Sequence, residues 1–368
     1  MINTVCEKDM CTGCTACVNI CPKNCIQLVD NIKSFDAVIN KDLCINCNLC
    51  KNVCQVNNID NPLIQLNKVL ECKEGKTKSD EINKLSASGG FATTLGIEFI
   101  KNGGYVVGIR NDLDEFKFDI TNNTEEVLKF AGSKYVKVIP NSIFKSIKEK
   151  LNQNDKVLFI GLPCQIAGLK LYLQKEYDNL YTIDLICHGT PSMKVLMKYL
   201  NEIGYSNTKG LSFRDKQDFK LFINKKPLIN KDIKDPYTVG FIQGLFYTNN
   251  CYSCKFAKEN RIGDITIGDS WGSNSDMKNS SLVLKNTLKG DYLLSLIKDY
   301  FTLIDGDFET IKKNNHQLNH ASLKQDYTDY YFDHFNDKIT YKIIKKAYPK
   351  IVLKQKIRHI LIKLHLKK

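Results

Sequence analysis

The 368 residues predict an α/β protein, α+β overall, in which a small cysteine-rich domain precedes a larger domain built on a largely parallel sheet. Three observations predict this fold class. Two short cysteine runs share one spacing, strand-like and helix-like segments alternate over residues 105–203, and residues 338–368 are basic and helical in pattern. We expect four parts: a cysteine-rich domain at 1–62, a linker at 63–85, an α/β domain at 86–335 and a basic amphipathic tail at 336–368.

Both cysteine runs of the first domain read C-x2-C-x2-C-x3-C. Three thiolates spaced in this way hold three corners of one [4Fe-4S] cluster, while the fourth thiolate binds the other cluster. We therefore expect two [4Fe-4S] clusters, one held by Cys11, Cys14, Cys17 and Cys54 and the other by Cys44, Cys47, Cys50 and Cys21. Two zinc knuckles are the alternative, but they use only two CxxC pairs per metal and leave the remaining cysteines unexplained. Cys6, Cys25 and Cys72 share no ligand spacing and are expected to be ordinary thiols.

Length and charge narrow the class of protein. A chain of this length buries a sizeable core without disulfides. Its start has no apolar signal-peptide core, and its apolar stretches are shorter than the ~20 residues of a membrane span. We therefore expect a cytoplasmic location. Nearly all of the net charge of +13 lies in residues 338–368, which hold eleven Lys or Arg and no Asp or Glu. The body is therefore close to neutral, and we expect no nucleic-acid partner.

The polar, lysine-rich segment 63–85 has the composition of a connector, and the regular elements follow it. Strands are expected at 105–109, 135–139, 157–160 and 181–186, and helices at 91–100, 141–151, 165–177 and 192–203. This alternation is typical of a parallel sheet covered by helices.

Four further cysteines have a plausible ligand role. Cys164 and Cys187 each follow a strand directly, so both should lie at the carboxyl edge of the sheet, where open α/β folds bind their ligands. Cys251 and Cys254 form a CxxC pair further along the chain. Together the four thiolates would hold a third [4Fe-4S] cluster or, as the alternative, a zinc ion. Buried small side chains are the other interpretation of Cys164 and Cys187.

Two motifs could hold an organic cofactor. The loop Ser86-Ala87-Ser88-Gly89-Gly90 precedes an apolar-periodic helix and would offer hydroxyls, backbone N–H groups and a helix N-terminus to a phosphate, with a plain helix cap as the alternative. The glycine-bounded strand 261–272 carries Asp264, Asp269 and Trp271, which suit ribose or flavin contacts and equally suit turns and core packing.

His188 adjoins Cys187 in the turn after the strand at 181–186. A histidine in this place could hydrogen-bond a cluster sulfur or a flavin and tune its reduction potential, so it is the candidate catalytic residue.

The tail has apolar residues at helical spacing among many Lys and Arg. These apolar residues are Leu353, Ile357, Ile360, Leu361 and Leu364. Such a helix lies on an anionic membrane surface at the inner face of the membrane, docks on an acidic partner, or packs on its own domain, and the pattern leaves these alternatives open.

The order of motifs closely resembles the coenzyme F420 hydrogenase/dehydrogenase beta-subunit family, in the version fused to an N-terminal dicluster ferredoxin. The resemblance covers residues 4–275. It is carried by SASGG (86–90), GSKYV (132–136), GLPCQIAGLK (161–170), DLICHGTPS (184–192), SFRDK (212–216) and CYSCKFA with RIGDITIGDSWG (251–272).

This resemblance implies a flavoprotein oxidoreductase with FAD and a third [4Fe-4S] cluster on Cys164, Cys187, Cys251 and Cys254. It also implies a flavin-phosphate site at 86–90, with Ser133 and Lys134 among the flavin contacts. Electrons would pass between a ferredoxin or another oxidoreductase subunit and a small two-electron acceptor, either coenzyme F420 or another molecule, since some relatives belong to cell-surface polysaccharide pathways. The Lys- and Asn-rich composition is typical of a low-GC anaerobe. The alternative function is a non-catalytic electron-relay subunit that delivers electrons to a separate enzyme.

Overall fold

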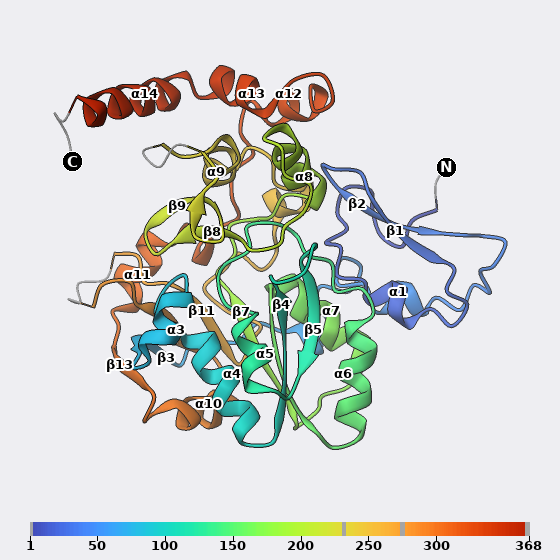
Figure 1. The fold of residues 1–368 in the computed structure, drawn as a ribbon. Helices are drawn as coiled ribbons and strands as arrows, with labels where there is room; N and C mark the ends of the chain where they lie inside the picture. The colour runs from blue at the N-terminus through green and yellow to red at the C-terminus, as the bar shows by residue number, and fades with distance from the viewer. Residues whose placement is uncertain (1–2, 230–232, 273–276, 365–368) are drawn as a thin grey trace.

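An eight-stranded mixed sheet forms the centre of the protein (Figure 1). The computed structural model describes residues 3–229, 233–272 and 277–364. The strand order is β13-β3-β12-β11-β7-β6-β4-β5. The strands are β3 (Glu71–Thr77), β4 (Gly104–Arg110), β5 (Lys117–Thr121), β6 (Lys156–Gly161), β7 (Leu180–Leu185), β11 (Ile265–Asp269), β12 (Ser281–Lys285) and β13 (Phe301–Asp305). β4, β6, β7 and β11 are parallel neighbours, and β3 runs the same way because β12 is antiparallel to both β11 and β3. The expected α/β class with a largely parallel sheet is confirmed.

Helices cover both faces of this sheet because its central strands are apolar on both sides. Val106 and Leu158 pack against the side chains of α4 (Phe91–Lys101) and α10 (Lys289–Ile297), with α5 (Thr124–Leu128) beside α4. Val107 and Phe159, one residue further along each strand, pack on the opposite face against α6 (Ile143–Asn152) and α7 (Pro163–Leu173). The alternation of side chains therefore builds two cores from the same strands.

The cysteine-rich domain contains the antiparallel strands β1 (Ile26–Asp30) and β2 (Phe35–Ile39) and the helices α1 (Ala16–Ile20) and α2 (Leu49–Asn52). It lies against α7 and α6, with the short helix η1 (Pro62–Ile64) also beside α7 (Figure 1). A Cβ atom at Gly168 of α7 would stand 2.7 Å from the Cβ atom of Cys14, so only glycine allows the close approach. The Asn19 side chain donates to the Asn141 carbonyl at 2.6 Å and fixes the same interface.

The remaining elements lie above the carboxyl edge of the sheet or at the end of the chain (Figure 1). A small sheet has the order β10-β9-β8, and α9 packs beside β9. The elements are β8 (Leu211–Asp215), β9 (Asp218–Ile223), β10 (Lys226–Pro227), α3 (Asp80–Leu85), α8 (Met193–Glu202), α9 (Pro236–Ile242), η2 (Asn249–Ser253), α11 (Phe308–Asn314), η3 (His316–Leu318), α12 (Thr328–Asp333), α13 (Thr340–Ala347) and α14 (Pro349–Lys363).

The segment 63–85, expected to be a linker, instead contributes β3 to the sheet, between β12 and β13. The polar composition of this segment does not indicate a strand. Lys73 of β3 pairs with Asp305 of β13 at 2.6 Å, and Glu71 of β3 pairs with Lys285 of β12. Cross-strand ion pairs therefore take the place of the apolar alternation that identifies a strand in a sequence.

Two other expectations differ from the structure. Residues 135–139 do not form a strand: the Lys137 amide donates to the Pro191 carbonyl at 2.8 Å, outside any ladder. The helix expected at 165–177 begins at Pro163, because proline suits the first turn of a helix. Cys164 thus lies in the first turn of α7. The helix expected at 141–151 begins at Ile143, with Ser142 at its N-cap position and Asn141 left-handed at φ 50°.

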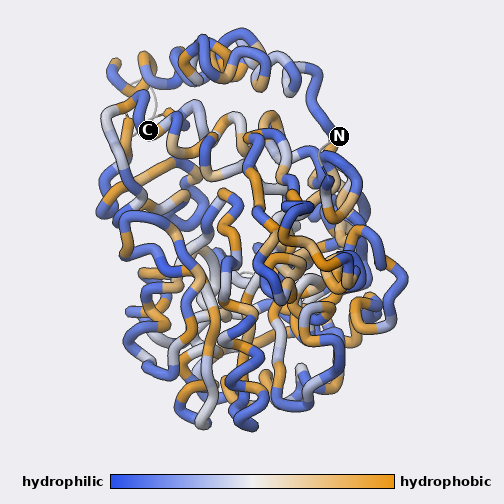
Figure 2. Tube along the Cα trace, turned by 90° about the vertical axis from the view of Figure 1, so that its right-hand side faces the viewer, coloured by the Kyte–Doolittle hydropathy of each residue, from blue (hydrophilic) through white to orange (hydrophobic). Residues whose placement is uncertain are grey.

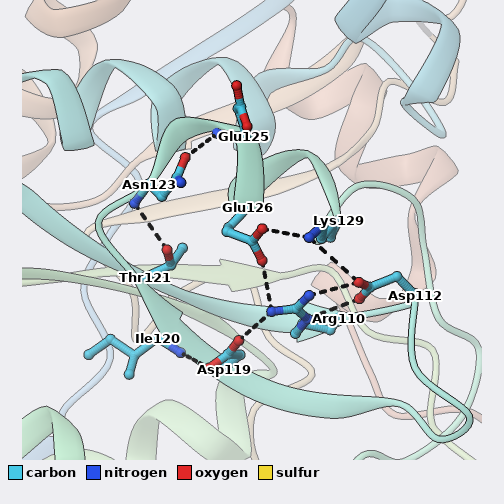
Figure 3. Close-up of polar contacts among 9 residues, drawn as sticks. All are labelled: Arg110, Asp112, Asp119, Ile120, Thr121, Asn123, Glu125, Glu126 and Lys129. Atoms are coloured by element: carbon cyan, nitrogen blue, oxygen red, sulfur yellow. Dashed lines mark hydrogen bonds and ion pairs between the residues drawn. The ribbon is translucent and has the colours of Figure 1, made fainter.

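The edge hairpin β4–β5 is held by a charge network (Figure 3). Arg110 at the end of β4 contacts Asp112 at 2.7 Å, Asp119 of β5 at 2.9 Å and Glu126 of α5 at 2.8 Å. Lys129, the C-cap residue of α5, pairs with Glu126 at 2.5 Å. One guanidinium thus connects two strands and a helix. The charged side chains also disfavour pairing of the edge strand β5 with strands of other chains.

Candidate functional site

The carboxyl edge of the sheet brings together the two cysteines that follow strands. β6 ends at Gly161 and Cys164 lies in the turn of helix directly after it, while β7 ends at Leu185 and Cys187 follows two residues later. Because β6 and β7 are parallel neighbours, both cysteines lie at the same edge, as the sequence predicted.

A cavity of about 310 Å³ at this edge is lined by all four cysteines, Cys164, Cys187, Cys251 and Cys254. Cys251 belongs to η2 and Cys254 follows it, so three separate chain segments supply the thiols. Met10, Thr12 and Gln55 of the cysteine-rich domain also line the cavity. The Gln55 side chain donates to the Cys164 carbonyl at 2.6 Å. The cavity therefore lies where the two parts of the chain meet.

Burial controls the charge of these thiols. It raises the pKa of Cys187 to about 12 and that of Cys254 to about 11, and the neighbouring cysteines add to the effect. Burial also raises the pKa of Cys164. Thiolate ligands form here only where positive charge offsets the loss of solvation.

Lys137 supplies such a charge inside the cavity. It is 2% exposed, and its Nζ lies 3.6 Å from the Cys164 sulfur. Burial alone would lower the pKa of Lys137, but Cys164, Cys251 and Cys187 outweigh it and hold the pKa above its usual value. No motif in the sequence points to this residue. The only signal in the sequence is a lysine within the otherwise apolar run 135–140.

Arg261 fixes the loop that carries Cys251 and Cys254. It is buried, its guanidinium donates to the Phe256 carbonyl and to the Leu185 carbonyl at 3.1 Å each, and it pairs with buried Asp184 at 3.3 Å. The cysteine loop is thereby joined to the strand that leads to Cys187. A buried arginine that serves several carbonyls acts as a rigid support.

His188 lines the same cavity, and its ring is held by neighbours that sequence reasoning missed. Its Nδ1 lies 2.5 Å from the Gln317 amide nitrogen of η3, and the His316 ring is 5.4 Å away. Burial, aided by His316, lowers the pKa of His188 to about 4. His188 is thus neutral at physiological pH, and its catalytic role stays a prediction.

The two cysteine runs of the N-terminal domain come together in the crossed arrangement. Burial raises the pKa of Cys14 to about 12, with further contributions from nearby Cys11 and Cys54. Cys17 also lies beside these three thiols. A second small pocket is lined by Cys21, Cys44, Cys47 and Cys50. Cys54 therefore lies with the first run and Cys21 with the second, and ligation of two [4Fe-4S] clusters by these groups stays a prediction.

The remaining cysteines have different surroundings. Cys6 lies beside Cys11 and Cys54, and the Cys25 sulfur lies 3.4 Å from that of Cys21. Both stand beside the expected ligands. Cys72 lies in β3, away from the cysteine groups, where burial raises its pKa to about 12.

The loop 86–90 lies near the same edge of the sheet. A Cβ atom at Gly89 would stand 2.1 Å from the Gly75 carbonyl oxygen, and Gly90 is the left-handed N-cap of α4 at φ 85°, so both glycines are needed for packing and backbone shape. The Ser88 hydroxyl lies 3.1 Å from that of Ser281, and the Ser86 hydroxyl donates to the Ile82 carbonyl. The N-terminus of α4 has no side-chain cap.

The β8–β9 hairpin brings two cations to this region. Lys216 donates to the Ser86 carbonyl at 2.9 Å, and Arg214 pairs with Asp269 at 2.5 Å. Arg214 also lies over the Phe219 ring at 4.4 Å, and Trp271 is 6.1 Å from that ring. The buried Nη2 atom of Arg214 has no hydrogen-bond partner among the described residues.

Three of the residues expected to bind a cofactor have other contacts. The Asp264 carboxylate accepts from the Thr182 amide at 2.8 Å and the Thr287 hydroxyl at 2.7 Å, at the amino end of β11 and away from the carboxyl edge. Lys134 donates to the carbonyls of the preceding turn, Phe130, Ala131 and Gly132. Ser133 lies beside the Tyr135 side chain. Cofactor contacts by these residues stay predictions.

Comparisons with known proteins agree with the motif order. Sequence models of the coenzyme F420 hydrogenase/dehydrogenase beta subunit match residues 72–144 (N-terminal part) and 154–306 (C-terminal part), which together make up more than half of the chain. A model of the 4Fe-4S dicluster domain matches residues 10–58.

A curated relative and a solved structure are also similar. The coenzyme F420-dependent sulfite reductase of Methanocaldococcus jannaschii is 23% identical over 280 residues, which make up 73% of this chain, and the chain spans 43% of that relative's length. A chain of the F420-reducing [NiFe] hydrogenase complex from Methanosarcina barkeri superposes with a TM-score of 0.51 at 20% identity, over 70% of this chain and 91% of that chain. The likeness to the solved structure supports the fold.

Proposed function

Because the chain belongs to the coenzyme F420 hydrogenase/dehydrogenase beta-subunit family and carries a 4Fe-4S dicluster domain, we propose that it is a flavin-dependent iron–sulfur oxidoreductase. It passes electrons between a redox partner protein and a small two-electron acceptor, either coenzyme F420 or another molecule, including one in a cell-surface polysaccharide pathway. One observation carries the proposal: four cysteines from three segments converge on a cavity that also touches the dicluster domain.

The cavity fits a third [4Fe-4S] cluster by its donor set. Four thiols are the usual ligands of such a cluster, and the buried Lys137 offsets their negative charge. A cluster bound by these thiols would supply single-electron transfer. Lys137 lowers the cost of keeping the thiols ionised, Arg261 holds the Cys251–Cys254 loop in place, and the tight contact of Cys14 with Gly168 keeps the dicluster domain close.

FAD binding is supported by the region beside the 86–90 loop. The uncapped N-terminus of α4 and the neighbouring Lys216 suit a pyrophosphate, while Arg214 has a buried N–H group left to donate. Trp271 offers an aromatic face near the same arginine. A flavin bound here would supply the exchange between one-electron and two-electron chemistry.

Cofactor content tests this function against a pure electron relay. Protein purified without oxygen should hold about twelve iron atoms per chain, from three four-iron clusters, and should release a flavin on denaturation. Cys164→Ser and Cys254→Ser should each lose about a third of the iron, whereas the control Cys72→Ser should keep all of it. About eight iron atoms with no flavin would instead indicate the relay subunit.

The tail adds a proposed contact with an anionic membrane surface. Leu353, Ile357, Ile360 and Leu364 lie along one side of α14 and are 49–60% exposed, so they do not pack on the domain. Figure 2 shows the mixture of hydrophilic and hydrophobic residues along the helices at the top of the molecule. Exposed apolar side chains among basic residues favour the interface of an anionic bilayer. Among the described residues, no helix has both the length and the apolar character to cross a membrane.

A further inference from the structure

The dicluster domain has an inner end and an outer end. The first cysteine group is buried, and the glycine of α7 packs directly on Cys14. The second group opens to solvent instead: Cys47 is exposed, Cys44 and Cys50 are half-buried, and a small pocket lies among them. Electrons that enter or leave the chain at this domain have their shortest route through the outer end.

The outer end carries an apolar patch with a basic rim, which we call the outer patch and define as Leu43, Ile45, Lys23, Lys41 and Lys51. The two apolar side chains are 55% and 57% exposed and lie directly beside the cysteines of the second group. All three lysines are exposed, as is Asp42 between Lys41 and Leu43, so the patch keeps a net positive charge. Two of them, Lys23 and Lys51, line the pocket among the cysteines, and its lining contains no carboxylate among the described residues.

We propose that the outer patch docks a small acidic electron-carrier protein that exposes its own one-electron centre. This inference rests on the proposed redox function and names the docking surface and the charge of the partner. An apolar centre with a charged rim is the usual anatomy of a specific interface, and opposite charge on the partner speeds the encounter. Each docking event oxidises the carrier by one electron and reduces the dicluster domain by one, so a two-electron reaction needs two events.

The charge of the patch argues against other occupants. A second copy of this chain would set lysines against lysines, which is unfavourable. A membrane surface is better served by α14, where the apolar stripe is longer and basic residues are more numerous. Weak electron-transfer complexes also bury little area, so a patch of a few side chains suffices.

The test compares two reductants by stopped-flow spectroscopy on the full chain. A purified acidic bacterial two-[4Fe-4S] ferredoxin, reduced beforehand, serves as the protein donor, and dithionite serves as the small donor. Ile45→Glu and the pair Lys23→Glu with Lys51→Glu should lower the second-order rate constant with ferredoxin at least tenfold. Rising salt should slow the wild type, and the salt dependence should be weaker in the lysine variant. Leu288→Glu, at an exposed leucine before α10, should match the wild type.

Dithionite reduction and iron content distinguish a loss of ferredoxin docking from a loss of the clusters themselves. Both should be unchanged in every variant, and Lys51→Gln provides a milder change if a glutamate variant loses iron. Equal ferredoxin rates in wild type and patch variants would overturn the docking proposal, as would a parallel loss with dithionite. If the wild type holds only eight iron atoms and no flavin while the patch variants still lose ferredoxin reduction, the enzymatic function fails and the docking surface stands.

Discussion

Replacing Lys137 with methionine should make the proposed four-cysteine cluster harder to reduce. The side chain keeps a similar length and apolar stem, so the change removes mainly one positive charge from a site that is 2% exposed. The charge lies 3.6 Å from the Cys164 sulfur and lines the same cavity as the other three cysteines. A cation at this place favours the state that carries one more electron, because the attraction grows with the negative charge of the centre.

The size of the effect follows from Coulomb's law. The added electron spreads over the bound group, so a mean separation of ~6 Å and an effective dielectric constant of ~20 are reasonable, and they give about 3 kcal/mol. For a one-electron couple, 1.4 kcal/mol corresponds to about 59 mV, so the reduction potential of the centre should fall by roughly 120 mV.

Redox titration followed by electron paramagnetic resonance measures this shift directly. Lys137→Arg keeps the charge and should leave the potential within a few tens of millivolts of the wild type, even though its fork differs from an ammonium group. Iron content should stay at the wild-type value in both variants. A methionine variant with full iron and an unchanged potential would refute the electrostatic role of Lys137.

Three further changes test other parts of the structure. Gly168→Ala places a Cβ atom 2.7 Å from Cys14, so α7 must shift; stability should fall by about 1–3 kcal/mol in denaturant unfolding, and electrons should pass more slowly from the dicluster domain to the four-cysteine centre. Arg261→Met leaves buried Asp184 without its ion-pair partner. The free energy of unfolding should fall by about 3–5 kcal/mol, with selective loss of the iron of the proposed third cluster, whereas equal stability would contradict the support role. Deletion of residues 348–368 should abolish salt-sensitive binding to phosphatidylserine vesicles without changing iron content, and equal binding by both forms would remove the tail from the membrane contact.

Some of the cysteine sites can be predicted from the sequence and others cannot, because some depend on spacing within a short segment and others on how distant segments fold together. The two N-terminal groups follow from spacing alone, since a short loop with three thiols can wrap one cluster. Cys164 and Cys187 could be assigned to one sheet edge because a strand followed by a turn fixes the edge without coordinates. Their meeting with Cys251 and Cys254 depends on the fold of three segments, and only the structure brings the four thiols to one cavity.

The supporting residues escaped prediction because their roles depend on distant partners. The sequence predicts a strand around Lys137, whereas the chain there is irregular and the Lys137 amide donates a hydrogen bond to the Pro191 carbonyl. The lysines and glutamates of β3 do not show the apolar alternation of a strand. Their ion pairs form only when β12 and β13 lie on either side. Arg214 and Lys216 belong to the SFRDK motif, whose sequence does not indicate their contacts. The β8–β9 hairpin places Arg214 beside Asp269 and Lys216 beside the 86–90 loop.

Lysines lie in different surroundings at the second cysteine group and at the four-cysteine cavity. Around the second group, Lys23 and Lys51 are exposed, so water and salt screen their charges, and their main effect is on the encounter with a partner. Lys137 lies in a buried cavity, where the same charge acts more strongly on the centre itself. A buried cation in the cavity therefore favours reduction of the proposed four-cysteine centre. Electrons that arrive at the outer patch should therefore collect at the cavity beside His188, where the two-electron reaction is proposed to occur.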